Sequence, residues 1–229
     1  MRDRARQVGR QAGMEPFDRR TVRAAYDATA ADYVAAFADD LDRLPLDRSV
    51  LDATLERLGR GAPVLDLGCG PGQVARYLAD RGASPVGVDL TPQMLVHAGR
   101  RTGGLGLGFA CADMRALPFG PQSFPAAVAF YSIQHLPRRE LPSVLGEIRR
   151  VLAPGGLLVI ATHLGEGEIT VDGLLGHAFD PIGGTFYGAE ELQTVLHSCS
   201  FLVERSWYRD PLPHEHRSRR IYLISRRDD

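Results

Sequence analysis

Three glycines packed into one short turn restrict this chain more than any other feature. Gly68, Gly70 and Gly72 follow the apolar run Val64-Leu65-Asp66-Leu67, and a helical pattern begins directly after them. Because glycine has no Cβ, the backbone can turn tightly there and a ligand can press against it. The start of the helix adds free N–H groups and a partial positive charge. The segment therefore predicts a strand, turn and helix built to hold a ligand.

An acidic residue at the end of the next expected strand points to a nucleoside. Asp89 closes the run Val86-Gly87-Val88-Asp89, and an acid about 20 residues after such a turn binds ribose hydroxyls in doubly wound sheets. Dinucleotide sites share this plan, but their third glycine would stand where this chain has Gln73. NAD stays open as an alternative ligand at this point.

Short apolar runs alternate with helical patterns along most of the chain, which predicts a doubly wound α/β fold. The expected strands cover residues 63–67, 85–89, 107–111, 126–131 and 157–162. Expected helices cover residues 18–41, 46–58, 73–81, 139–152 and 189–199, with a further helix opened by Thr91 and Pro92. Two last runs, 201–207 and 220–225, are joined by a short connection, which favours an antiparallel hairpin.

The length of 229 residues fits a single domain. We expect a flexible tail over 1–17 and a single domain over 18–229, with a helical cap at 18–60. Residues 164–187 exceed ordinary loop length, so we expect a lid or loop on the substrate side. No apolar run approaches a membrane span, and the start lacks a signal-peptide core, so we expect a cytoplasmic protein. The three widely spaced cysteines suggest neither disulfides nor a zinc site, and we expect no metal.

The charged residues exclude several classes of protein. All 27 basic residues are arginine, so the chain has no lysine for a P-loop or a Schiff base. The formal net charge of −1 argues against a nucleic-acid partner. Arg2, Arg4, Arg6 and Arg10 could form a nucleic-acid arm, although a solvated tail is the simpler interpretation.

Four motifs in order resemble the class I S-adenosylmethionine-dependent methyltransferases, particularly the branch that acts on small molecules. They are residues 64–72 (VLDLGCGPG), 87–95 (GVDLTPQML), 112–119 (ADMRALPF) and 150–158 (RVLAPGGLL). The resemblance covers about residues 17–226. It implies a Rossmann-like, seven-stranded, mostly parallel sheet with an antiparallel last strand, and S-adenosylmethionine as the cofactor. One departure is Pro125, which precedes the fourth strand where the family often has an acid.

The resemblance also implies cofactor contacts. Asp66, Gly68 and Gly70 would surround the methionine part of the cofactor, and Asp89 would bind the ribose. Asp113 resembles the acid that bonds the adenine amino group. The remaining contacts implied by the family are Leu90, Met94, Met114, Tyr131, and Tyr26 and Tyr33 on a helix over the cofactor.

Methyl transfer from a sulfonium is an in-line displacement, so positioning supplies most of the catalysis and at most one base is needed. Ligands bind outside the carboxyl ends of parallel strands, which nominates Tyr131, His135 and His163. A histidine pKa near neutrality suits a base, and His163 is the best candidate. Residues that could face the acceptor are Asp172, His177, Phe179, Phe186, Tyr187, Trp207, Tyr208, His214, Glu215 and His216.

The sequence thus predicts an enzyme that transfers the methyl group of S-adenosyl-L-methionine to a small molecule, such as a biosynthetic or secondary metabolite. A methyltransferase acting on RNA or protein and a NAD-dependent oxidoreductase are the alternatives. The acceptor, the methylated atom and the oligomeric state cannot be read from the residues.

Overall fold

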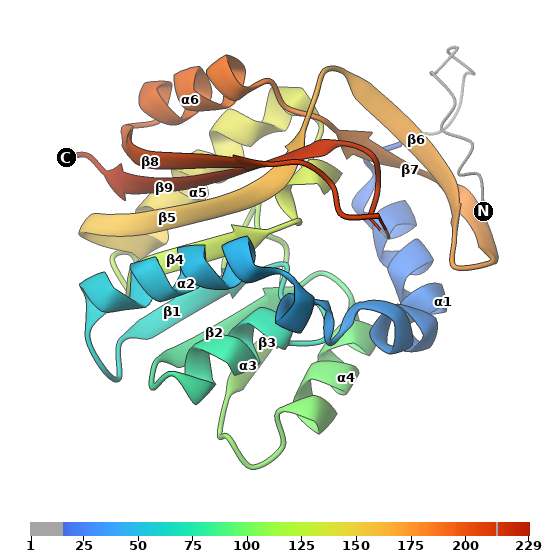
Figure 1. The fold of residues 1–229 in the computed structure, drawn as a ribbon, viewed down its shortest axis with the longest axis horizontal. Coiled ribbons are helices and arrows are strands. Elements are labelled where there is room, and N and C mark those ends of the chain that lie inside the picture. Colours follow the sequence, from blue (N-terminus) through green and yellow to red (C-terminus); the bar gives the residue numbers. More distant parts are fainter. Residues whose placement is uncertain (1–15, 214) are drawn as a thin grey trace.

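A seven-stranded sheet forms the centre of the molecule, in the strand order β3-β2-β1-β4-β5-β9-β8 (Figure 1). The computed structural model describes residues 16–213 and 215–229, so the tail arginines and His214 lie outside the described residues. The strands of the sheet are β1 (Pro63–Leu67), β2 (Ser84–Asp89), β3 (Gly108–Cys111), β4 (Phe124–Phe130), β5 (Leu152–Leu164), β8 (Phe201–Arg209) and β9 (Arg219–Arg227).

The direction of the strands confirms the predicted fold class. β1 to β5 pair in parallel, and β9 runs antiparallel between β5 and β8. The closing hairpin and the antiparallel last strand are therefore both present. This topology gathers the carboxyl ends of the parallel strands at one edge, where doubly wound sheets bind ligands.

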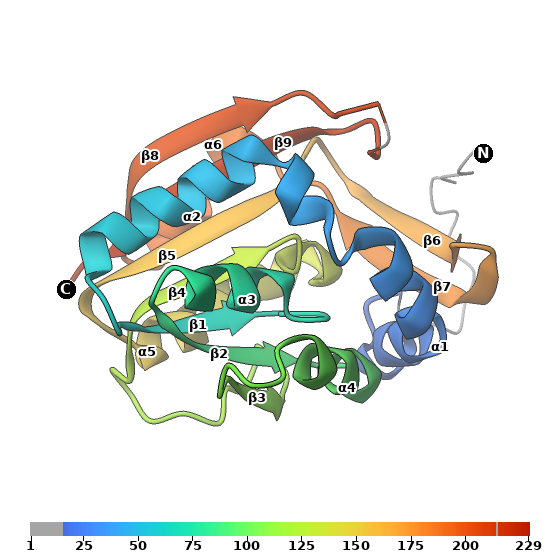
Figure 2. The same cartoon turned by 60° about the horizontal axis from the view of Figure 1, so that its bottom comes forward.

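Helices cover both faces of the sheet (Figure 2). Their bounds are α1 (Arg19–Phe37), α2 (Pro45–Leu58), α3 (Gln73–Asp80), α4 (Pro92–Arg101), α5 (Leu141–Val151) and α6 (Ala189–Ser198). Short 3₁₀ helices lie at η1 (Asp40–Arg43), η2 (Ile133–His135) and η3 (Arg138–Glu140). Apolar side chains of α2 and α3 join one buried cluster, and those of α5 and α6 join another. Alternate residues of β1 and β4 belong to alternate clusters, as a sheet buried on both faces requires.

The segment 164–187 differs from the expected loop because most of it forms a two-stranded hairpin. β6 (Glu168–Leu174) and β7 (His177–Thr185) pair antiparallel apart from the main sheet. Leu175 and Gly176, the two linking residues, have φ of 52° and 87°, the positive values that a tight hairpin turn requires. The hairpin lies along α1 (Figure 1), where Ile182 packs against Val22 and Ala25.

The first helix begins where its capping residue predicts. The Asp18 carboxylate accepts hydrogen bonds from the backbone N–H groups of Arg20 (2.7 Å) and Thr21 (3.3 Å), which satisfies donors that a helix start leaves free. The helix ends at Phe37, earlier than expected. Phe17, which we placed in the tail, is buried, and its ring lies where a Cβ on Gly183 of β7 would be. Within the described residues, no helix is both long enough and apolar enough to cross a membrane.

Replacement of Gly87 tests the packing between β2 and the glycine turn. A Cβ at this position would lie 2.7 Å from the Phe109 ring and 2.8 Å from the Cys69 sulfur. We expect Gly87→Ala to lower the free energy of unfolding by about 1–3 kcal/mol, because overpacking forces neighbours to move. Denaturant unfolding measures this change.

Gly99→Ala is the matched control. Gly99 lies in α4, and a Cβ there would meet nothing within 4 Å. This variant should raise the free energy of unfolding by about 0.5–1 kcal/mol, because alanine favours helix. Equal effects of the two variants would contradict the packing argument.

Candidate functional site

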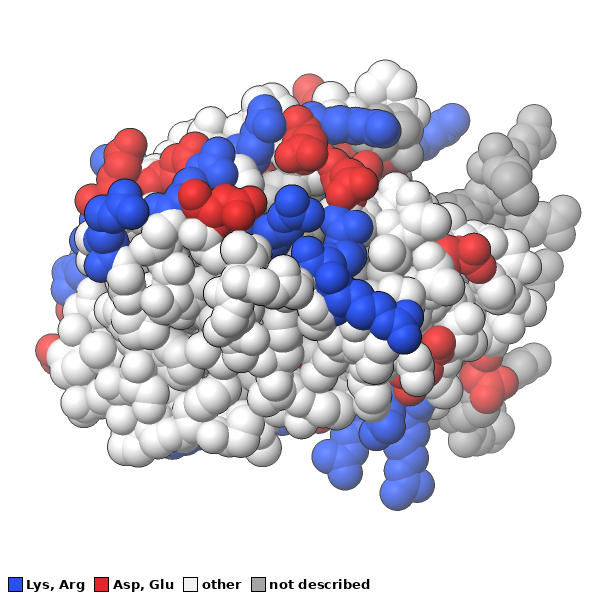
Figure 3. All heavy atoms as spheres, turned by 90° about the horizontal axis from the view of Figure 1, so that it is seen from below, with Lys and Arg blue, Asp and Glu red and all other residues white. Residues whose placement is uncertain are grey.

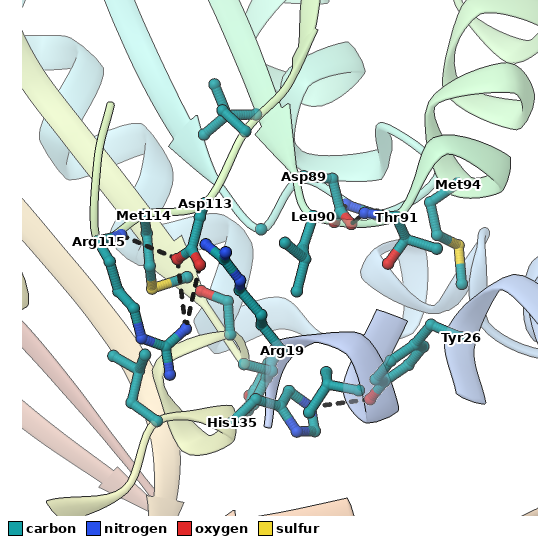
Figure 4. Close-up of a pocket in the computed structure, with 18 of the residues that line it drawn as sticks. Arg19, Tyr26, Asp89, Leu90, Thr91, Met94, Asp113, Met114, Arg115 and His135 are labelled. Carbon is teal, nitrogen blue, oxygen red and sulfur yellow. Dashed lines mark hydrogen bonds and ion pairs between the residues drawn. The ribbon is translucent and has the colours of Figure 1, made fainter. Parts of the chain in front are cut away.

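An open cavity lies at the carboxyl ends of the parallel strands (Figure 4). This is the edge at which doubly wound sheets bind ligands. Its lining brings together eleven residues predicted from the sequence: Tyr26, Tyr33, Gly68, Gly70, Asp89, Leu90, Met94, Asp113, Met114, Tyr131 and His135. It also includes residues that the sequence analysis did not single out, among them Phe17, Arg19, Arg115 and Ser132.

The glycine turn forms one wall of the cavity. Gly68, Gly70 and Gly72 have φ of 68°, 51° and 81°, the left-handed conformation that glycine adopts at little cost. A Cβ on Gly68 would lie 2.4 Å from the Ser132 Cβ, so the turn and the end of β4 are in direct contact. The glycines are therefore required both by backbone conformation and by the close approach of β4.

Asp89 joins the glycine turn to the end of β2. Its Oδ2 accepts a hydrogen bond from the Gly70 N–H at 2.8 Å, and its Oδ1 accepts one from the Thr91 N–H at 2.8 Å. Burial raises the pKa of the Asp89 carboxyl, and these two hydrogen bonds act in the opposite direction. Each carboxylate oxygen has a second acceptor site, so Asp89 can hold the turn and a ligand hydroxyl together.

Asp113 lies on the opposite side of the cavity, beside Met114 (Figure 4). Its carboxylate accepts hydrogen bonds from Arg115, whose guanidinium also donates to the Glu140 carboxylate at 2.6 Å. The Asp113 carboxylate can still accept a hydrogen bond from a donor group of a ligand.

His135 connects three separate parts of the chain below the cavity. Its Nδ1 lies 3.4 Å from the Gly183 carbonyl oxygen, and its Nε2 lies 2.8 Å from the Tyr26 hydroxyl. Because a carbonyl can only accept, Nδ1 carries the proton and Nε2 accepts from Tyr26. Burial lowers the pKa of His135 to about 4, so the ring is neutral at physiological pH.

Tyr131 links the cavity to a buried polar network. Its backbone φ is 53°, an uncommon value for a residue other than glycine. Its hydroxyl lies 3.0 Å from Asp47 and 2.8 Å from the Tyr222 hydroxyl. Arg209 donates to Tyr222 at 3.1 Å and pairs with Glu215, so the network reaches the connection between β8 and β9. Asp47 is only 1% exposed, and sequence alone gave no signal for it because its partners are far away in the chain.

His163 and Asp66 lie outside the set of described residues that line the cavity. The His163 ring contacts those of Tyr131, Phe186 and His216, with centroids 5.8, 5.7 and 5.6 Å away. Burial and the neighbouring Arg220 lower the pKa of His163 to about 3. Burial is the largest cause of this shift, and the Glu215 carboxylate acts in the opposite direction.

Asp66 is buried in β1 below the glycine turn, at 1% exposure. Burial raises the pKa of its carboxyl to about 7, and the nearby Asp89 carboxylate contributes in the same direction.

Other residues expected near the acceptor divide into two groups. Phe186 and His216 do converge on His163, stacked with an interplanar angle of 27°. Tyr187 instead is fully buried in the core, and His177 bonds Asp32 of α1 at 2.6 Å. In the described part of the chain, no three His, Cys, Asp or Glu side chains are grouped so as to hold a metal ion.

Comparison with known proteins agrees with this geometry. The methyltransferase-domain family matches residues 64–156. A malonyl-[acyl-carrier protein] O-methyltransferase of Halorhodospira halophila is 39% identical over 155 residues, covering 65% of this chain and 50% of that protein. A demethylmenaquinone methyltransferase of Thermus thermophilus is 39% identical over 117 residues, covering 49% of this chain and 51% of that protein.

A solved structure supports the same fold over nearly the whole chain. The 1,6-didemethyltoxoflavin-N1-methyltransferase of Burkholderia thailandensis, with bound S-adenosylhomocysteine, superposes with a TM-score of 0.74 at 21% identity, covering 98% of this chain and 95% of that chain. This chain belongs to the class I S-adenosylmethionine-dependent methyltransferases. It spans about half the length of the curated relatives named above. The family membership replaces the NAD alternative that the glycine turn left open.

The cavity of this methyltransferase fits S-adenosylmethionine on its own chemistry. Gly70 lines the cavity, and a Cβ there would have only the Gln73 Oε1 near it, at 3.9 Å. The Asp89 carboxylate is placed to accept from hydroxyl groups. Ser132 belongs to the lining, and its Oγ is a buried polar atom without a hydrogen-bond partner among the described residues, which is costly.

The burial of His135 predicts a pH dependence of folding for this methyltransferase. The unfolded state binds a proton near pH 6.5, whereas the folded state resists it down to about pH 4. Stability from this group is therefore complete above pH 6.5 and is lost as the pH falls towards 4. We expect a loss of about 2–3 kcal/mol over this interval, and a smaller loss in His135→Gln, by denaturant unfolding at each pH.

His197→Gln on the exposed end of α6 is the control, and it should follow the parent protein. The same acid loss in His135→Gln as in the parent would show that other groups cause it.

Proposed function

We propose that this methyltransferase transfers the methyl group of S-adenosyl-L-methionine to a small-molecule acceptor. The observation that carries the proposal is that the glycine turn, Asp89 and Asp113 line the same cavity. Relatives are named for a carrier-bound malonyl group, a quinone and a sterol, which supports a small acceptor.

The chain's residues would hold the cofactor from three sides. Gly68 and Gly70 would approach its methionine part, Asp89 would accept from the ribose hydroxyls, and Asp113 would accept from the adenine amino group. Leu90, Met94 and Met114 would supply apolar contact. Tyr26 and Tyr33 would cover the cofactor from α1, where their rings meet edge to face at 5.8 Å. Asp66 would lie beneath the glycine turn, on the side of the cofactor's methionine part.

Positioning would account for most of the catalysis. S-adenosylmethionine supplies a methyl group on a positively charged sulfur, which an incoming nucleophile displaces in line. The fixed turn and the tyrosines would hold the reacting groups aligned, and such alignment can contribute roughly 7–11 kcal/mol. Neutral tyrosines suit this place, since burial raises the pKa of Tyr33 to about 12 and that of Tyr26 further.

The acceptor would enter beside Tyr131, where β4, β5 and the connection between β8 and β9 converge. His163, Phe186 and His216 form an aromatic wall next to Tyr131, and the hairpin β6–β7 with α1 would act as the lid. Charged side chains of both signs mix on the face shown in Figure 3. A nucleic-acid acceptor would favour a strongly basic chain, whereas the formal net charge here is −1, so we prefer a small molecule.

Calorimetry with S-adenosylmethionine, S-adenosylhomocysteine and NAD, each measured alone, tests the cofactor assignment. We expect micromolar binding of S-adenosylmethionine or S-adenosylhomocysteine. Asp89→Ala should weaken this binding by about 2–4 kcal/mol, because two hydroxyls lose a charged acceptor. Asp80→Ala on the surface of α3 is the control and should bind as the parent does. Binding of NAD without binding of either methionine-derived ligand would overturn the proposal.

His163→Ala tests how the acceptor loses its proton. A base with a pKa of about 3 gains little from taking a proton at neutral pH, so we propose that His163 orients the acceptor. We expect turnover to fall by less than about 10²-fold, at the lower limit for removal of a general base, with cofactor affinity unchanged. Labelled cofactor and an acceptor found by mass spectrometry of candidate libraries provide the measurement. A loss near 10⁴-fold would instead make His163 the base.

A further inference from the structure

Arg115 is a charged group in the cavity for which the proposed methyl transfer has no use. It lines the cavity together with Asp113 and Met114, and Figure 4 shows its guanidinium turned towards the Asp113 carboxylate. Its side chain is 28% exposed, and that of Asp113 is 12% exposed. An ion pair this sheltered from water fixes geometry more strongly than a surface pair does.

The contacts with Arg115 treat the two oxygens of Asp113 differently. Oδ1 accepts from the Arg115 backbone N–H at 3.0 Å and from Nη1 at 3.3 Å. Oδ2 is 3.4 Å from the same Nη1, which is a longer and weaker contact. Oδ1 is thus occupied, while Oδ2 keeps its acceptor capacity for a ligand.

Glu140 holds Arg115 from the other side. The Arg115 Nε donates to Glu140 Oε2 at 2.6 Å, and the pair brings η3 to the end of β3. The guanidinium is planar and its donors point in fixed directions. The Arg115 guanidinium contacts Glu140 with one edge and Asp113 with the other, so it has little freedom to rotate. Its fixed orientation also restricts the plane of the Asp113 carboxylate.

We propose that Arg115, anchored by Glu140, is a positioning residue that makes Asp113 select a purine carrying an amino group at its six position. The inference rests on the proposed function, because it assigns the adenine end of the cofactor to Asp113. A six-amino group donates to Oδ2, whereas a six-oxo group would bring its oxygen against a negative oxygen. Without Arg115 the carboxylate could rotate or turn to water, and the selection would weaken.

The test compares S-adenosylhomocysteine with S-inosylhomocysteine by calorimetry. The two ligands differ in the group at the six position and in the proton that the oxo form carries on N1. We expect the parent protein to prefer the adenosyl ligand by about 100-fold, as a charged hydrogen bond implies. Arg115→Met should reduce the preference to less than about 10-fold, and Glu140→Gln should reduce it by about 3-fold. Arg115→Lys should restore only part of it, since lysine lacks the planar fork.

Arg57→Met is the matched control. Arg57 forms a 2.6 Å ion pair with Glu204 at similar exposure, between α2 and β8, outside the cavity lining. This variant should keep the parent preference. Thermal unfolding of each variant checks that the fold is retained.

The ratio of the two dissociation constants separates positioning from a structural role. If Arg115→Met weakens both ligands equally and leaves the ratio unchanged, Arg115 only supports the fold and the proposal is overturned. A parent protein that binds both ligands alike overturns it as well. If the parent protein binds neither ligand, the proposed cofactor is wrong. That result would overturn the proposed function and not only the role of Arg115.

Discussion

The two hydrogen bonds that the Asp89 carboxylate accepts, from Gly70 and from Thr91, organise the whole ligand edge of this methyltransferase. They join the turn after β1 to the start of α4, so the backbone of the turn cannot drift from the end of β2. The same carboxylate is buried, and desolvation raises its pKa. Hydrogen bonds from two backbone N–H groups and from the Thr91 side chain favour its charged form, and the carboxylate keeps acceptor capacity for a ligand hydroxyl.

A second constraint holds the cap in place, and it passes through His135. One imidazole ring bonds the Tyr26 hydroxyl on α1 and the Gly183 carbonyl on β7, while its own backbone follows β4. Phe17 packs at Gly183 in the same region. The cap and the hairpin are therefore attached to the sheet at the point where the cofactor would end. An opening motion of α1 would have to break these contacts together. Cofactor access therefore depends on the local stability of the contacts between α1, β7 and His135.

Features that depend on neighbouring residues could be predicted from the sequence. Features that depend on contacts between distant parts of the chain could not. The strands, the closing hairpin and the glycine turn follow from apolar runs and from residues whose conformation is restricted. The hairpin β6–β7 was missed because its turn is Leu175-Gly176, without the Asn-Gly or Asp-Gly pair that normally signals one. The low pKa of His163 depends on burial in the folded core and, to a lesser extent, on Arg220 of the distant strand β9, and local sequence patterns report neither.

The same difference between local and long-range contacts separates the proposed site into a cofactor half and an acceptor half. Substitutions in one half can leave the other half unchanged. The cofactor half depends on short motifs, in which neighbours along the chain supply most contacts, as Asp89 and Thr91 do. The proposed acceptor half would depend on Tyr131, whose hydroxyl reaches Asp47 from α2 and Tyr222 from β9. Since these partners are linked only through the folded core, substitutions in the connection between β8 and β9 can reshape the acceptor side while the glycine turn stays intact. A fold built in this way can keep one cofactor and accept different substrates.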